Sequence, residues 1–162
     1  MTDNLITQAY STPTVIVGRI LNPNEAHIER IKTKQNTAVA IGDLLYFDTT
    51  GYAPATPTII AAAVKGWRPY VALEACAAVT STSYYIRAVR GPGAIVGVTA
   101  TVIAGTGTLN TGLRGCRVAS SATAGAVILS TKVTSTATEL CEIGTLHGDV
   151  SCGDTGYWVQ LD

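Results

Sequence analysis

Short apolar runs, each closed by a turn signal, recur along the whole chain at intervals of roughly 8 to 12 residues. The clearest run is Leu44 to Phe47, which follows the turn residues Gly42-Asp43 and ends at Asp48-Thr49-Thr50-Gly51. Such a run of aliphatic and aromatic residues is too short for a helix and is typical of a strand. We therefore expect an all-β protein, a short-stranded barrel or sandwich.

The same reading predicts strands or apolar runs at Thr14–Leu21, Tyr70–Cys76, Tyr84–Val89, Ala94–Ala104, Leu113–Ala119, Val127–Leu129, Glu139–Ile143 and Tyr157–Leu161. Tyr52 to Pro57 reads as a Pro-rich loop. Ala26 to Gln35 fits either a helix or an edge strand, in which Lys32 and Lys34 protect the edge. Thr58 to Val64 fits either two helical turns or a strand.

The composition argues against several classes of partner. The 162 residues include 11 basic and 11 acidic side chains, whereas a nucleic-acid or membrane-surface protein usually carries a basic excess. The least polar stretch, Ala94 to Gly105, is far shorter than the roughly 20 residues of a membrane span. The N-terminus lacks a signal-peptide pattern, so we expect a soluble protein made in a cytoplasm, binding neither nucleic acid nor membrane.

Motifs of reaction chemistry are missing from the sequence. It contains no Gly-x-Ser-x-Gly, His-Glu-x-x-His or P-loop, and Asn110 replaces the third glycine after Gly105-Thr106-Gly107. Four aspartates lie in Gly-, Thr- or Ser-containing turns, where Asp is expected for turn geometry alone, so they do not require a calcium site: Asp43, Asp48, Asp149 and Asp154. The cysteines form no Cys-x-x-Cys pair and read as small buried hydrophobes, with a Cys116–Cys141 disulfide left open. We expect no enzyme, no catalytic residue, no cofactor and no metal site.

An internal repeat is suggested by matched spacing. Val71 to Val89 aligns without gaps on Ile143 to Leu161, which places Tyr85 on Tyr157 and Ile86 on Trp158. Upstream, Gly42 to Gly51 falls on Gly115 to Gly125 with one inserted residue. This predicts two similar tandem β units that share a core, because each is too small to bury its own faces well.

Three segments follow from these patterns. Residues 1–12 form an N-terminal arm, 13–92 a first β unit and 93–162 a second, divided at Gly91-Pro92-Gly93, although one compact domain is also compatible. The arm is polar but carries Leu5, Ile6 and Tyr10, which we expect either to bind another chain or to strap its own core. The large aromatics fit either core packing or a carbohydrate platform, and strand alternation favours the core.

Three segments together resemble the small β-rich head decoration proteins of tailed bacteriophages: Ala38–Gly51, Tyr70-Val71-Ala72-Leu73-Glu74 and Ile86-Arg87-Ala88-Val89-Arg90-Gly91. In that group a Gly-Asp strand, a Thr-Gly turn, an apolar-Ala-Leu-Glu strand and a strand ending before glycine recur in this order. The resemblance covers about residues 36–92. The second unit departs from it, with Cys116 in place of Asp43 and Gly144-Thr145-Leu146 in place of Ala-Leu-Glu.

The resemblance implies a non-enzymatic cement protein, made in the host cytoplasm, on the outer capsid surface of the virion. It would bridge subunits of the major capsid protein and form a homo-oligomer, often a trimer. Leu5, Ile6 and Tyr10 would then contact the capsid or a neighbouring subunit. The alternatives are another phage structural module, such as a head-fibre base or tail-associated protein, and a carbohydrate-binding or adhesin-like β module.

Overall fold

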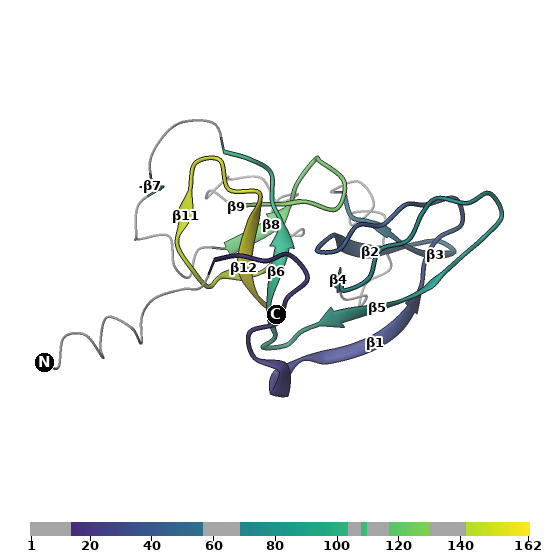
Figure 1. The fold of residues 1–162 in the computed structure, drawn as a ribbon, viewed down its shortest axis with the longest axis horizontal. Coiled ribbons are helices and arrows are strands. Elements are labelled where there is room, and N and C mark those ends of the chain that lie inside the picture. Colours follow the sequence, from purple (N-terminus) through teal and green to yellow (C-terminus); the bar gives the residue numbers. More distant parts are fainter. Residues whose placement is uncertain (1–13, 57–68, 104–107, 110–116, 130–141) are drawn as a thin grey trace, which may run out of the picture.

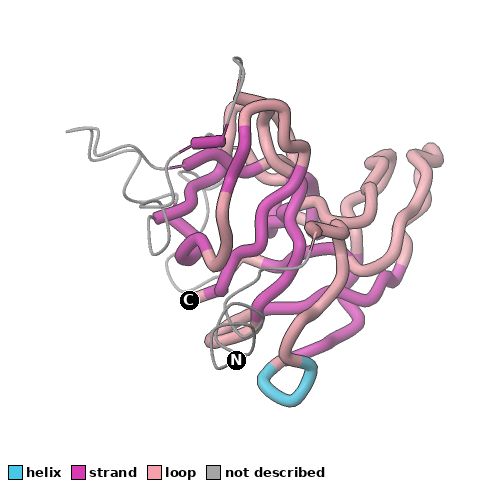
Figure 2. Tube along the Cα trace, turned by 60° about the vertical axis from the view of Figure 1, so that its left-hand side comes forward, coloured by secondary structure: helices cyan, strands magenta, loops and turns pink. Residues whose placement is uncertain are grey.

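The computed structural model describes residues 14–56, 69–103, 108–109, 117–129 and 142–162. In these residues the fold is all-β, as predicted, and the one helical element is the short 3₁₀ turn Pro23–Glu25. Figure 1 shows two groups of strands side by side, and Figure 2 shows them from a second direction. The ambiguous segment Thr58–Val64 lies outside the described residues.

Each group of strands is a five-stranded antiparallel sheet. The first sheet has the order β1-β5-β4-β2-β3 and contains β1 (His27–Lys32), β2 (Leu44–Asp48), β3 (Gly51–Pro54), β4 (Tyr70–Ala72) and β5 (Tyr85–Arg90). The second has the order β6-β12-β10-β8-β9 and contains β6 (Ile95–Thr99), β8 (Arg117–Ser120), β9 (Val127–Leu129), β10 (Glu142–Leu146) and β12 (Gly156–Leu161). A separate ribbon pairs β7 (Thr108–Leu109) with β11 (Val150–Ser151).

The two sheets have the same topology. When the five strands of each sheet are numbered in chain order, both sheets read first, fifth, fourth, second, third. In each sheet, the residue just after the first strand forms an isolated parallel bridge with the strand at the opposite edge. The bridges are Thr33 with Tyr52 in the first sheet and Ala100 with Val127 in the second. This shared pattern confirms the prediction of two similar tandem β units.

The gapless alignment of the last strands was nevertheless wrong by one residue. Tyr85 is 62% exposed, whereas Tyr157, its supposed counterpart, is 1% exposed. Thr33 and Ala100 are equivalent positions, because each follows the first strand of its sheet and forms the parallel bridge. Thr33 N donates to Tyr84 O and Ala100 N donates to Thr155 O, so Tyr84 corresponds to Thr155. Tyr157 lies two residues after Thr155 and therefore shares the face of Tyr84, not that of Tyr85. A shift of one residue moves every side chain to the other face of a strand.

The units share a hydrophobic core. One cluster joins Leu44, Val71 and Val89 of the first sheet to residues such as Val96 and Val159 of the second, and all five side chains are fully buried. The alternate residues of the first sheet form a second cluster on its opposite face, with Leu45, Tyr70, Ala72, Ile86 and Ala88 among its members. Because the first cluster draws on both sheets, neither unit buries its faces alone.

Backbone hydrogen bonds also tie the units together. Leu44 N donates to Gly125 O (2.7 Å), Gly125 N donates to Ala55 O (3.0 Å), and Thr99 N donates to Gly42 O (2.9 Å). Gly42 and Gly125 have φ values of +86° and +78°, in the left-handed region that glycine adopts readily. The turn at the start of β2, the clearest sequence motif, is thus also a point of contact between the units.

The predicted strand Thr14–Leu21 is not a regular strand. A turn at Val17-Gly18, where Gly18 has φ +75°, interrupts it, and Ile20 alone forms a bridge, with Val96. Its backbone lies along the outer edge of β6, because Gly97 has no side chain to hold it away: a Cβ at Gly97 would lie 2.2 Å from Ile16 O. This segment precedes β1, the first strand of the first sheet, but covers the edge of the second sheet.

Two other segments differ from or refine the predictions. The predicted Pro-rich loop Tyr52–Pro57 begins inside a strand, β3, because Pro54 lies on the sheet's outermost strand, where proline is tolerated. Ala26–Gln35 contains the edge strand β1, which settles that ambiguity, and Lys32 is exposed on it. β4 ends at Ala72, earlier than predicted, and Cys76 forms an isolated bridge with Val39.

Candidate functional surfaces

A hydrogen-bonded cluster around Glu29 joins three strands of the first sheet. Tyr70 donates its hydroxyl to Glu29 Oε2 (2.7 Å), and Arg90 Nε and Nη2 lie 3.1 and 3.0 Å from Oε1. His27 Nε2 lies 2.5 Å from the same Oε1. The Tyr70 hydrogen bond, with Arg90 and His27, lowers the pKa of Glu29, while burial and Glu29 raise the pKa of Tyr70. Both carboxylate oxygens are occupied, so the cluster fastens β1 to β4 and β5.

A second cluster lies where the chain ends. Arg117 Nε donates to Glu142 Oε2 (2.8 Å), and its two Nη atoms donate to the two carboxylate oxygens of Asp162. The Arg117 hydrogen bonds lower the pKa of Asp162 and those to Asp162 and Glu142 raise that of Arg117. Glu142 and Asp162 border a cavity of about 240 Å³, which is also lined by Pro69, Gly91, Ile143 and Leu161. The charges of the cluster are paired with each other, which indicates a structural fastening.

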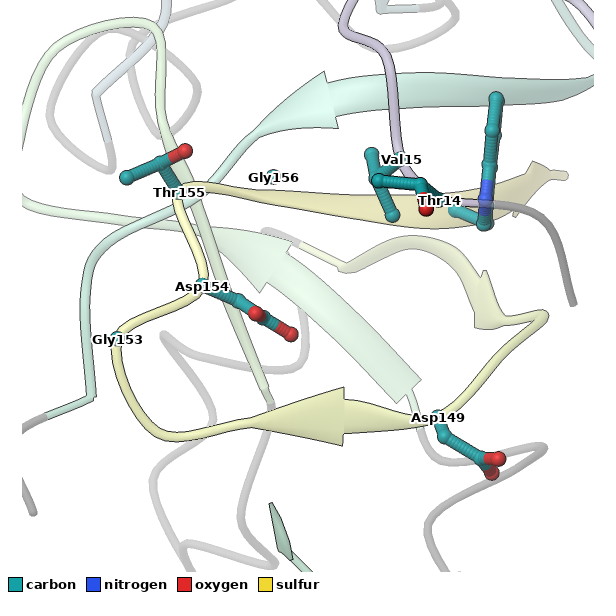
Figure 3. Close-up of a pocket in the computed structure, with 8 residues that line it drawn as sticks. Thr14, Val15, Asp149, Gly153, Asp154, Thr155 and Gly156 are labelled. Carbon is teal, nitrogen blue, oxygen red and sulfur yellow. The ribbon is translucent and has the colours of Figure 1, made fainter. Parts of the chain in front are cut away.

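A larger recess of about 390 Å³ lies against the second sheet (Figure 3). Thr14 and Val15 form one side, and the turn from Gly153 to Gly156 forms another. Asp154 Oδ2 accepts a hydrogen bond from Ser151 N (2.8 Å), and the Asp149 and Asp154 carboxylates do not converge on one point in Figure 3. Among the described residues, no group of three His, Cys, Asp or Glu side chains is placed to hold a metal.

Asp43 serves its turn, as predicted. Asp43 Oδ2 accepts a hydrogen bond from Ala40 N (2.8 Å), and burial raises the pKa of Asp43. Asp48, the last residue of β2, instead forms an ion pair with Lys34 (2.5 Å), which follows β1 in the chain. Cys76 and Cys152 are free, half-buried thiols, whereas Cys116 and Cys141 lie outside the described residues. Leu5, Ile6 and Tyr10, the predicted partner-binding residues, also lie outside them.

The aromatic side chains do not form an exposed row in the described part of the chain. Tyr157 and Trp158 are each 1% exposed, Tyr70 is 7% exposed and Tyr84 is half-buried. Tyr52 packs edge-on against Tyr70, with ring centroids 5.0 Å apart. Core packing, the favoured reading of the sequence, is confirmed for these rings.

One exposed surface was missed by the sequence reasoning. We call it the β1–β5 face: Ile28, Arg30 and Lys32 of β1 with Tyr85 and Arg87 of β5, where Arg30 pairs with Arg87 and Lys32 with Tyr85. Ile28 is 46% exposed and Arg87 forms an ion pair with Glu74 (2.6 Å). Basic and apolar residues at alternate positions of both strands were the available signal, but the pairing of the two strands could not be read from the sequence.

Comparison with known proteins found no matching family model, no matching curated protein and no matching solved structure. Among the described residues, no helix is long and apolar enough to span a membrane. The features of the chain itself therefore carry the functional argument.

Proposed function

We propose that this protein decorates a viral capsid: it binds the outer surface of an assembled head and stabilises the shell by bridging major capsid subunits, without catalysis. One observation carries the proposal. The residues that resemble phage decoration proteins, about 36–92, supply four consecutive strands of one sheet, β2 to β5, in the order of the family pattern. Their Gly-Asp and Thr-Gly motifs form the turns at both ends of β2.

The described polar clusters support a structural role. The Glu29 and Arg117 clusters each connect neighbouring strands, and their charged groups are satisfied by one another. Two small sheets that share a core and are cross-bonded at Gly42 and Gly125 make one packed body, and only 14% of the chain's residues are charged. Such a body suits a broad and closely fitting contact with a protein shell.

The proposed partners are the major capsid protein and further copies of this chain, with a trimer as the favoured oligomer. Leu5, Ile6 and Tyr10 are the proposed contact residues of the arm. The location is the outer capsid surface of the virion. A head-fibre base or tail-associated module would also be a non-enzymatic structural protein. It differs from a decoration protein in where it attaches to the virion.

A carbohydrate-binding module is the weaker alternative. Sugar recognition by stacking needs exposed aromatic faces, but Tyr157 and Trp158 are buried, and Tyr85 is the one large exposed aromatic side chain among the described residues. A single ring next to Arg87 and Lys32 gives little area for a sugar chain.

The test is co-sedimentation of the purified protein with phage heads that lack their decoration protein. We expect saturable binding at a fixed ratio to the major capsid protein. A variant with Leu5→Asp and Ile6→Asp should bind less, while Ile128→Asp, which changes an exposed apolar residue of β9, serves as the matched control. No binding to heads, together with retention on a glycan array, would exclude the decoration role.

A further inference from the structure

The outer edge of β6 is covered by the protein's own chain. Four backbone hydrogen bonds cover it, in order along the strand: Leu21 N to Ile95 O (2.9 Å), Gly97 N to Arg19 O (2.9 Å), Gly18 N to Gly97 O (2.7 Å) and Thr99 N to Gly42 O (2.9 Å). β6 therefore has partners on both sides, β12 on one and mainly residues 18–21 on the other. The second unit exposes no free edge here.

β1 occupies the equivalent place in the first unit, but its outer edge is open at Ile28 and Arg30, before the bridge of Thr33 with Tyr52. The register with β5, together with the bond from Thr33 N to Tyr84 O, directs the backbone groups of Glu29 and Ile31 towards β5 and those of Ile28 and Arg30 away from it. Within the described part of the chain, no hydrogen bond reaches the N–H or C=O of Ile28 or Arg30. Figure 1 shows β1 along the margin of the molecule, with no strand drawn beyond it.

The lengths of the preceding segments explain the difference. The first sheet begins at β1, and residues 14–26 before it are long enough to cross to β6 and cover it. The second sheet begins at β6, and only residues 91–94 separate it from β5, which are too few to return along β1. The duplication thus leaves one of two equivalent edges without its covering segment.

An open edge beside an exposed apolar side chain is a template for an added strand. Ile28 is 46% exposed next to the unpaired groups. Two β1 strands from different copies would pair poorly, because Arg30 and Lys32 would face the same positive charges across the new interface. A strand that brings no Lys or Arg is a better partner.

We propose that the open edge of β1 binds residues 1–13 of a second copy of this chain as an added β-strand. This segment contains Asp3 and no Lys or Arg, so its side chains bring no positive charge to Arg30 and Lys32. Thirteen residues span up to about 43 Å when extended, more than enough to run along a six-residue strand. Thr14, where the segment joins the described chain, lies at the recess of the second unit beside Trp158, so the segment leaves from the unit that does not contain β1.

Amide hydrogen exchange of the full-length protein, followed by NMR, tests the proposal within a single strand. Glu29 and Ile31 bond to β5 and should exchange slowly at every protein concentration. Ile28 and Arg30 should exchange at least about tenfold more slowly at high concentration than at low concentration, because only the assembled form bonds them. In the Leu5→Asp, Ile6→Asp variant these two amides should exchange fast at both concentrations.

Three other results would overturn the proposal. Protection of Ile28 and Arg30 in a protein that sediments as a monomer would mean that each arm covers its own β1. Fast exchange at all concentrations would mean that the edge is open between copies, and protection that appears only when phage heads are added would assign the edge to the capsid. Sedimentation velocity gives an independent reading: mass should rise with concentration for the wild type and for a Val79→Asp control, and not for the arm variant.

Discussion

Gly97→Ala should detach the segment that covers β6. The new methyl group would lie 2.2 Å from Ile16 O and 2.8 Å from Ile16 C, backbone atoms that can yield only if the whole segment moves. Three hydrogen bonds join residues 18–21 to β6, and at about 1 kcal/mol each their loss would lower the free energy of unfolding by up to about 3 kcal/mol. Gly97 has no positive φ, so alanine strains no backbone angle there and the effect isolates the close approach.

The assay combines urea unfolding with limited tryptic digestion. Arg19 is exposed in the covering segment, and its peptide bond to Ile20 should be cut faster when the segment detaches. Gly153→Ala is the matched control: a Cβ there meets nothing within 4 Å, and its φ of +89° should cost only about 1 to 2 kcal/mol. If Gly97→Ala is as stable as wild type and is cut no faster after Arg19, the segment does not pack on β6 as described.

Three further predictions follow from the core, the faces of the strands and the ion pairs. Leu44→Ala, in the shared cluster, should lower the free energy of unfolding by about 2 to 5 kcal/mol and keep a single transition in both Trp fluorescence and circular dichroism; two separate transitions would contradict the shared core. Tyr85→Ser should change stability by less than about 0.5 kcal/mol, whereas Tyr157→Ser should cost about 3 kcal/mol or more; equal losses in urea unfolding would restore the alignment that we rejected. The pKa values of Glu29 and Asp162 are lowered in the fold, so the unfolded state binds more protons in acid. The stability that these two groups supply is therefore present above about pH 5 and is lost as the pH falls through their folded pKa values. Glu29→Gln should flatten the acid side of the stability profile, and an unchanged slope would exclude the role assigned to Glu29.

Local signals predicted the strands and turns that local chemistry determines. The Gly42-Asp43 turn, β2 and the strand at Val127–Leu129 follow from turn residues and β-branched or aromatic content. The duplication was also visible, because turn spacing survives when side-chain identity does not. The alignment of β5 on β12 was wrong because two tyrosines at adjacent register positions look alike in sequence, although a one-residue shift reverses their faces.

The remaining features depend on contacts between distant segments. Thr14–Leu21 has the composition of a strand, but its docking on β6 requires the turn at Gly18 and the bare backbone of Gly97, about eighty residues away. The open edge of β1 and the β1–β5 face likewise depend on which strands become neighbours. The Glu29 cluster was missed for the same reason, since Tyr70 and Arg90 reach Glu29 only after β4, β5 and β1 have paired.

The central claim, that this chain works as an architectural addition to an assembled shell, is tested most directly by imaging. Icosahedral reconstructions of phage heads that lack their decoration protein should be compared before and after saturation with the purified chain. We predict new density on the outer surface, in contact with two or more neighbouring major capsid subunits and large enough for the two β units. An unchanged head surface, or density confined to a tail or fibre attachment point, would contradict the claim.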